Sequence, residues 1–292
     1  MPISFHRKPG PQTTRSIVAD GQQLRIDVRP GTGRRPPLLL VNGIGASLEL
    51  LQPFVDALDP GLEVIRFDAP GVGGSPLPGL PYRFTGLCRL MARLLSALGH
   101  GEADVLGISW GGGVAQHFAT FQRHRCRRLV LVATATGSLM VPARPSVLAR
   151  MVTPRRYLDR GYLRENAADL YGGSARGQPE RISALMHANS RVGPALGYVY
   201  QLASGAGWTS LPFLPLISQP TLIISGDDDP LIPLANARLM HSLIPRSRLH
   251  VYHGGHLALV TEAAELAPVV GRFLAADLPD DGGRAAHNGK RG

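Results

Sequence analysis

The chain has 292 residues, of which 44% are hydrophobic and 18% charged, and these proportions are ordinary for a globular domain. No apolar run approaches the roughly 20 residues that span a bilayer, and the polar N-terminus lacks the apolar region of a signal peptide, which predicts a cytoplasmic protein with no transmembrane segment. The formal net charge is +10, but the basic residues are scattered along the chain, which argues against nucleic-acid binding.

The densest group of basic residues lies between a predicted helix and a predicted strand and comprises Arg123, Arg125, Arg127 and Arg128. A nucleic-acid site would concentrate its charge on one element and interleave it with aromatic residues, so we expect no nucleic-acid partner. The net positive charge leaves attraction to an anionic surface open, because charge governs association rather than fold.

Short apolar segments rich in β-branched residues alternate along the chain with longer helical patterns. This alternation is typical of a mostly parallel sheet covered by helices. In chain order, the predicted strands are residues 22–28, 37–42, 62–68, 103–107, 128–133, 221–225 and 248–252. The predicted helices are residues 48–58, 83–98, 110–121, 235–243 and 262–274.

The alternation stops between residues 137 and 219, where helical patterns continue without a strong strand and Pro and Gly are frequent. We interpret residues 137–219 as a helical lid inserted between two strands of a core, which comprises residues 1–136 and 220–276. Residues 277–292 are polar and glycine-rich, which predicts a disordered tail.

The two cysteines, Cys88 and Cys126, are too few for a disulfide framework or a metal cage. We therefore expect them to be buried or half-buried thiols. No group of residues has the spacing of metal ligands, so the sequence predicts no metal site.

Residues 107–111 read GISWG and lie between a predicted strand and a predicted helix. In the α/β-hydrolase fold, a serine nucleophile stands on such a turn, and its neighbours two positions away must be small because strand and helix nearly touch. Gly107 and Gly111 meet this requirement around Ser109, and the helix N-terminus offers partial positive charge to an oxyanion. A glycine-rich turn could match these letters by chance, so the position between strand and helix carries the prediction that Ser109 is the nucleophile.

Three adjacent aspartates, Asp227 to Asp229, follow the predicted strand 221–225, in the chain order of nucleophile, acid and base that this fold requires. In hydrolases of this fold the acid commonly lies three residues after a glycine and four before a proline, which selects Asp229. Its carboxylate would hold the catalytic imidazole in one tautomer and stabilise the imidazolium. Asp227 and Asp228 are expected to cap the turn or face solvent.

The predicted base is His256, which follows Gly254 and Gly255 after the last predicted strand. The two glycines would let a loop bring the imidazole over the nucleophile. His253 is the competing candidate, but it lies before the glycines, whereas this fold places the base on the loop.

Ester hydrolysis also requires backbone N–H groups directed at the tetrahedral oxyanion. One would belong to Trp110, directly after the nucleophile. The second is assigned to Ile44, in the segment Val-Asn-Gly-Ile-Gly that follows an early strand. Many relatives have His-Gly where this chain has Asn42 and Gly43, and we expect Asn42 to brace the loop through its own backbone.

Residues 67–75 read FDAPGVGGS and superficially resemble a phosphate-binding loop, but they lack the Gly-Lys-Ser/Thr ending. Asp followed by Gly-x-Gly-x-Ser is a recurring structural turn in this fold. We therefore expect Asp68 and Ser75 to organise the turn rather than to act in catalysis.

Several segments together resemble one family more specifically than the nucleophile turn does. They read NGIGASLELLQPFVDALDP, FDAPGVGGSPLPGLPYRF, GISWGGGVAQHFA, GWTS, QPTLIISGDDDPLIPL and GGHLALVTEA, with the lid segments TPRRY and YGG. This set resembles the intracellular depolymerases of medium-chain-length poly(3-hydroxyalkanoates), from about Ser16 to Ala275. Residues 1–12 and the C-terminal tail lie outside the resemblance.

The resemblance implies hydrolysis of a storage polyester at a granule surface, with release of 3-hydroxy acids. Carried over by residue, Ser109 is the nucleophile, Asp229 the orienting acid and His256 the base, and no cofactor is required. The monomer length, the oligomeric state and the need for a helper protein on granules are not implied.

Two other functions fit the same residues. The first is a small-molecule carboxylesterase or lipase, or a hydrolase of carbon–carbon bonds, on the same fold. Polyester synthases also share the fold, but they use a cysteine nucleophile. The second is a non-catalytic granule-binding protein, which would not need to keep three catalytic residues together.

The predicted lid contains apolar residues that would line an acyl tunnel or adsorb to polymer, although most of them are expected to form the lid core. They are Leu139, Met140, Val141, Met151, Tyr157, Tyr198, Tyr200, Trp208, Leu211 and Phe213.

Overall fold

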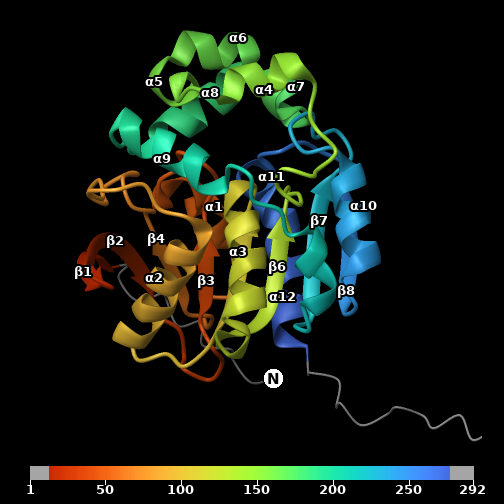
Figure 1. Ribbon diagram of the computed structural model, residues 1–292. Coiled ribbons are helices and arrows are strands. Elements are labelled where there is room, and N and C mark those ends of the chain that lie inside the picture. The colour runs from red at the N-terminus through yellow and green to blue at the C-terminus, as the bar shows by residue number, and fades with distance from the viewer. Residues whose placement is uncertain (1–12, 277–292) are drawn as a thin grey trace, which may run out of the picture.

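A computed structural model describes residues 13–276, whose eight strands form a single sheet in the order β1-β2-β4-β3-β5-β6-β7-β8 (Figure 1). Strands β3 to β8 run parallel, whereas β2 runs antiparallel to both of its neighbours, β4 and the edge strand β1. The strands are β1 (Thr13–Ala19), β2 (Gln22–Arg29), β3 (Leu38–Val41), β4 (Val64–Phe67), β5 (Ala103–Ile108), β6 (Cys126–Val132), β7 (Thr221–Gly226) and β8 (Ser247–Tyr252). The predicted mostly parallel sheet is confirmed.

Helices cover both faces of the sheet because strand side chains alternate between the two faces. Leu38 and Leu40 of β3 contribute to the apolar core on one face, and Leu39 and Val41 to that on the other. The first face is covered by α1 (Gln52–Ala57), α11 (Ala258–Thr261) and α12 (Ala263–Ala275). The second face is covered by α2 (Phe84–Ala97), α3 (Trp110–Phe121) and α10 (Leu234–Leu243).

Four elements differ from the sequence-based expectation, and one of them is the unpredicted 3₁₀ turn η2 (Arg123–Arg125). Strand β1 was not predicted; its burial pattern is that of a solvent-facing edge, so it lacks a strong apolar signal. The single helix expected at 48–58 is a 3₁₀ turn, η1 (Leu48–Leu51), followed by α1, which begins with Pro53 in its first turn. The short helix α11 was also not predicted.

All named elements of the segment between β6 and β7 are helices, as the sequence indicates. Its elements are α4 (Pro145–Met151), α5 (Arg155–Leu158), α6 (Arg160–Tyr171), α7 (Ser174–Gly177), α8 (Pro179–Ala188), α9 (Ala195–Gly205) and η3 (Leu211–Leu216). The two ends of this segment meet where Gly137 forms a bridge with Thr209. Helices α4 to α9 lie above the carboxyl ends of the parallel strands (Figure 1). We refer to residues 137–219 as the helical segment.

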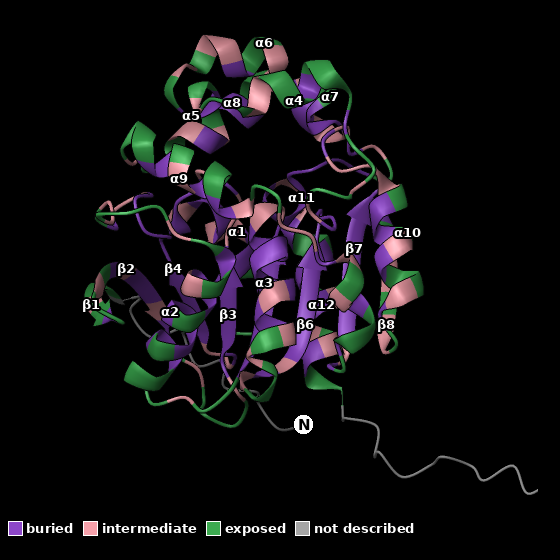
Figure 2. Cartoon of the chain, in the orientation of Figure 1, coloured by how far each residue is buried: buried purple, intermediate pink, exposed green. Residues whose placement is uncertain are grey.

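The helical segment shares one apolar core with the α1–α12 face of the sheet. Tyr157, Leu163 and Tyr198 belong to the same buried cluster as Leu38 and Leu106. Its outward surfaces are more exposed than the central strands β3 to β7 below it, which are almost entirely buried (Figure 2). Burying apolar surface in common with the core attaches the segment to the sheet.

Two of the basic residues at the start of β6 make contacts that stabilise the fold. Arg127 forms an ion pair with the buried Asp104, and Arg128 donates hydrogen bonds to the carbonyl groups of Leu274 and Ala276. These contacts fasten β6 to β5 and to the end of α12. Cys88 and Cys126 are both buried free thiols, as expected.

Asp68 and Ser75 organise the turn after β4, as the sequence predicts. Asp68 is fully buried and accepts hydrogen bonds from the N–H groups of Leu48 and Gly74 at 2.7 Å each. The Ser75 hydroxyl donates to the Asp68 carbonyl at 2.7 Å. The turn therefore connects β4 to the start of η1.

The disorder predicted for residues 277–292 falls outside the described residues, as do residues 1–12 of the predicted core. Within residues 13–276, none of the helices combines the length and the hydrophobicity that a membrane-crossing helix needs.

Candidate active site

Ser109 lies at the turn between β5 and α3, in a strained backbone conformation. Its φ of 55° and ψ of −120° are rare for a residue other than glycine. A Cβ atom on Gly107 would lie 2.2 Å from the Gly111 carbonyl oxygen, and one on Gly111 would lie 2.2 Å from that of Val41. Close approach of strand and helix therefore explains why residues 107 and 111 are glycines.

The pairing of β3 with β5 brings the loop after β3 beside this turn. Val41 lies opposite Gly107 in the parallel register, so the residues that follow Val41 flank Ser109. Asn42 braces the loop as expected: its Oδ1 accepts from the Gly43 N–H at 3.0 Å, and its Nδ2 donates to the Ser47 carbonyl at 2.7 Å.

Asp229 and His256 come together from the loops after β7 and β8. His256 Nδ1 lies 2.8 Å from Asp229 Oδ2, and both side chains are buried. Asp229 Oδ1 accepts hydrogen bonds from the N–H groups of Leu231 and Ile232 at 2.9 and 2.8 Å. Carboxylate oxygens accept hydrogen bonds, so a hydrogen on Nδ1 satisfies this contact and leaves Nε2 as an acceptor.

The other two aspartates have different partners. Asp228 pairs with Arg176 of the helical segment at 2.6 Å, and this hydrogen bond lowers the pKa of Asp228. Asp227 pairs with the exposed His253 at 3.0 Å, and the interaction raises the pKa of His253. His253 and His256 thus each contact a different aspartate, and only His256 is directed into the interior.

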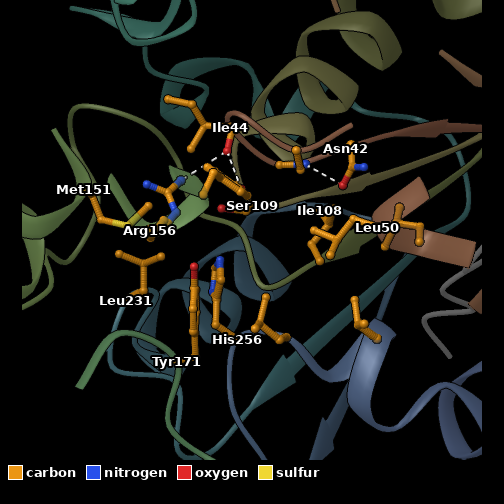
Figure 3. Close-up of a pocket in the computed structure, with 16 residues that line it drawn as sticks. Asn42, Ile44, Leu50, Ile108, Ser109, Met151, Arg156, Tyr171, Leu231 and His256 are labelled. Carbon is orange, nitrogen blue, oxygen red and sulfur yellow. Dashed lines mark hydrogen bonds between the residues drawn. The ribbon is translucent and has the colours of Figure 1, made fainter. Parts of the chain in front are cut away.

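The helical segment contacts the loop that carries His256. The His256 N–H donates to the Tyr171 carbonyl at 2.7 Å, and the two rings lie nearly parallel with centroids 6.3 Å apart. A Cβ atom on Gly255 would lie 1.9 Å from that same carbonyl oxygen, so the loop requires glycine at this position. Figure 3 shows the Tyr171 ring beside the His256 imidazole.

Two cavities meet at Ser109 and Ile44. The first also contains His256 and is otherwise mostly apolar (Figure 3); its lining includes Leu50, Leu51, Ile108, Met151, Arg156, Tyr157, Tyr171, Leu231, Leu257 and Val260. The second lies on the side of α3 and is lined by aromatic and aliphatic groups, including Phe84, Trp110, Met140, Leu202, Trp208 and Ile232. The second cavity, with a volume of about 220 Å³, has room for an apolar chain beside Ser109, whereas the first holds only about 30 Å³ in this structure.

Ser109 and His256 line the same cavity without a direct hydrogen bond in this structure. The sequence-based reasoning did not single out Arg156, Tyr171 or Gln201, which also contact the site. The motifs TPRRY and YGG contain the first two, but no local pattern in either motif indicates a role. Among residues 13–276, no group of three or more His, Cys, Asp or Glu residues could hold a metal ion.

Comparison with known proteins identifies the fold family of this chain. The family model for the alpha/beta hydrolase fold matches residues 36–263. The chain is 51% identical to a poly(3-hydroxyalkanoate) depolymerase of Ectopseudomonas oleovorans, across 91% of this chain and 94% of the relative. It is 30% identical to a 2-hydroxymuconate semialdehyde hydrolase of Pseudomonas sp. (strain CF600), across 91% and 95% of the two chains.

Among solved structures, the enol-lactonase from Burkholderia xenovorans LB400 superposes with a TM-score of 0.77 at 22% identity, and the match covers 90% of this chain and all of that one. At this identity the match shows the shared fold alone. The sequence-based resemblance to poly(3-hydroxyalkanoate) depolymerases is confirmed by the relative from Ectopseudomonas oleovorans. The chain belongs to the α/β-hydrolase fold family.

Proposed function

We propose that this chain hydrolyses ester bonds of medium-chain-length poly(3-hydroxyalkanoates) at the surface of granules inside the cell, using Ser109, Asp229 and His256 as its catalytic triad. The observation that carries this proposal is the buried pair of His256 and Asp229, 2.8 Å apart, in a cavity that also contains Ser109. The 51% identity to a poly(3-hydroxyalkanoate) depolymerase supports the choice of substrate.

In the proposed reaction, Ser109 Oγ attacks the ester carbonyl carbon while His256 Nε2 takes the hydroxyl proton. The N–H groups of Ile44 and Trp110 stabilise the oxyanion of the tetrahedral intermediate. Its collapse breaks the ester C–O bond, and His256 returns the proton to the departing alcohol. Water then attacks the acyl-enzyme, again giving a proton to His256, and releases the 3-hydroxy acid and free Ser109.

The larger cavity at Ser109, with a volume of about 220 Å³, supports an ester that carries an apolar group on one side, and the cavity that contains His256 is smaller, at about 30 Å³. One cavity contains His256, which must reach the departing oxygen, so we assign it to the alcohol side of the ester. The other cavity, lined by Phe84, Trp110 and Trp208, then receives the acyl side. A polyester with medium side chains presents apolar groups on both sides of each ester bond.

Acid release from polymer is the test that separates this proposal from a small-molecule esterase. Granules of poly(3-hydroxyoctanoate) incubated with the protein are expected to release 3-hydroxyoctanoate, measured by chromatography against a protein-free control. The same preparation should also hydrolyse a soluble octanoate ester. Turnover of the soluble ester without acid release from granules would be consistent with a serine esterase but would reject the polymer as its substrate.

Exposed apolar residues support adsorption of the helical segment to polymer. Ten of the fourteen exposed large apolar residues within 13–276 belong to this segment, although it makes up less than a third of that length. They are Leu139, Val141, Leu148, Val152, Leu158, Val192, Leu196, Val199, Leu202 and Leu216. We therefore propose that the segment acts as a lid whose outer face contacts the granule.

Replacing Val152, Leu158 and Val199 together with serine is expected to weaken binding to granules at least tenfold. These side chains are 60%, 60% and 50% exposed, and covering each one with polymer would contribute about 1 kcal/mol from buried apolar area. Turnover of a soluble octanoate ester should remain within about twofold, because none of the three lines either cavity. Sedimentation of the protein with granules measures the binding.

The matched control carries serine at Val18, Leu80 and Val251, three exposed apolar residues outside the helical segment. This control is expected to bind granules as the wild type does. Equal losses in the two triple variants would show that binding depends on general hydrophobicity and would reject the proposed adsorption face.

A further inference from the structure

The loop after β3 presents two consecutive peptide groups with different partners. The Gly43 carbonyl accepts a hydrogen bond from the Ala46 N–H at 3.2 Å. In a trans peptide the N–H points away from the carbonyl, so the Ile44 N–H is directed away from this turn. Within residues 13–276, the Ile44 N–H has no protein acceptor, as a donor reserved for an oxyanion requires.

The following peptide group, between Ile44 and Gly45, is bonded at both of its polar atoms to the helical segment. The Ile44 carbonyl accepts from the Tyr157 hydroxyl at 2.8 Å and from Arg156 Nη2 at 3.1 Å (Figure 3). The Gly45 N–H donates to Gln201 Oε1 at 2.7 Å. Burial raises the pKa of the Tyr157 hydroxyl, which therefore stays protonated and able to donate.

Gln201 also contacts the second predicted oxyanion donor residue. The Trp110 indole N–H donates to the Gln201 backbone carbonyl at 3.1 Å, and Gln201 is 1% exposed. One residue of α9 thus contacts Trp110 with its backbone and Gly45 with its side chain. The helical segment thus holds the Ile44–Gly45 peptide and also contacts the side chain of Trp110, the residue that carries the second predicted donor.

The loop after β3 also packs closely against the helical segment at Gly45. Gly45 has a φ of +74°, and a Cβ atom there would lie 2.7 Å from the Tyr157 ring and 2.8 Å from the Tyr198 ring. The loop can approach the two tyrosines only because residue 45 is glycine. The Ile44–Gly45 peptide cannot rotate without breaking hydrogen bonds to two helices of the segment.

We propose that Tyr157 and Gln201 are positioning residues that hold the oxyanion donors, so that the oxyanion hole is complete only while the helical segment is docked on the sheet. This inference rests on the proposed function, because it takes Ile44 and Trp110 as the donors. Oxyanion donors act at about 2.7–3.1 Å, and a displacement of about 1 Å near a reacting centre lowers the rate on the order of a hundredfold. The hydrogen bonds fix the Ile44–Gly45 peptide and, through the Ile44 backbone, orient the preceding peptide that carries the Ile44 N–H, so they act on kcat rather than on substrate binding.

The variants Tyr157→Phe and Gln201→Leu test this role on a soluble octanoate ester. Each is expected to lower kcat about tenfold, and the double variant about a hundredfold, with KM within about twofold of wild type. The affinity for an octyl trifluoromethyl ketone, whose adduct with Ser109 carries the oxyanion, should fall in proportion to kcat/KM. The matched control is Ser183→Ala, which removes a partly buried hydroxyl-to-carbonyl hydrogen bond of 3.0 Å between Ser183 of α8 and Arg160 of α6, away from the loop.

Circular dichroism melts of all variants separate positioning from loss of fold. If Ser183→Ala lowers kcat as much as Tyr157→Phe at equal stability, the effect is structural and the inference is overturned. If Tyr157→Phe and Gln201→Leu keep wild-type kcat while Ser109→Ala is inactive, the inference fails and the proposed function stands. If Ser109→Ala retains activity, the proposed function itself is rejected.

Discussion

Replacing Ser109 with alanine is expected to lower kcat for a soluble octanoate ester on the order of 10⁵-fold or more, and to abolish acid release from polymer granules. Alanine removes the attacking oxygen but keeps the side chain small at a turn with a φ of 55°. The fold should therefore be retained. Covalent labelling with a fluorophosphonate, followed by mass spectrometry, should place the label on Ser109 in the wild type and find none in the variant.

Strand β7, which is separated from β5 by β6 in the sheet, provides a matched control for this substitution. Ser225 ends up buried at the carboxyl end of β7, and its hydroxyl has no hydrogen-bond partner among residues 13–276. Ser225→Ala is therefore expected to keep wild-type activity and labelling. Substantial turnover by Ser109→Ala, at a melting temperature like that of the wild type, would refute Ser109 as the nucleophile.

Replacing Asp229 with asparagine is expected to lower kcat on the order of 10⁴-fold while the protein stays folded. The amide would present a donor or a weaker acceptor to His256 Nδ1, so the imidazole would lose the tautomer that leaves Nε2 free to take a proton. Asparagine retains an oxygen that can accept from the Leu231 N–H. Steady-state kinetics on the soluble ester measures the effect.

Asp228→Asn is the matched control for Asp229→Asn, because it makes the same chemical change one residue away. Asp228 is paired with Arg176 near the surface, so its loss is expected to change kcat less than threefold. A larger loss of activity in Asp228→Asn than in Asp229→Asn would show that the acid of the triad was assigned to the wrong aspartate.

The sequence alone determined the features that depend on neighbours in the chain. Alternation of apolar strands with helical patterns predicted the mostly parallel sheet, and α3 begins and ends where its pattern indicated. The nucleophile turn could be predicted because the strand, Ser109 and the helix follow one another in the chain. Two glycines at fixed spacing therefore indicate that the strand and the helix approach each other closely. Strand β1 was missed, since a solvent-facing edge strand has little apolar alternation to reveal it.

Tertiary structure alone decided which distant groups share the site. Asp227, Asp228 and Asp229 are adjacent in the chain, but they bond to three different partners, and only the fold shows which partner each one has. Contacts of Tyr157 and Gln201 with the loop after β3 join residues more than a hundred positions apart. No local pattern encodes such contacts, because they arise only when packing of the helical segment against the sheet brings its side chains over the carboxyl ends of the strands.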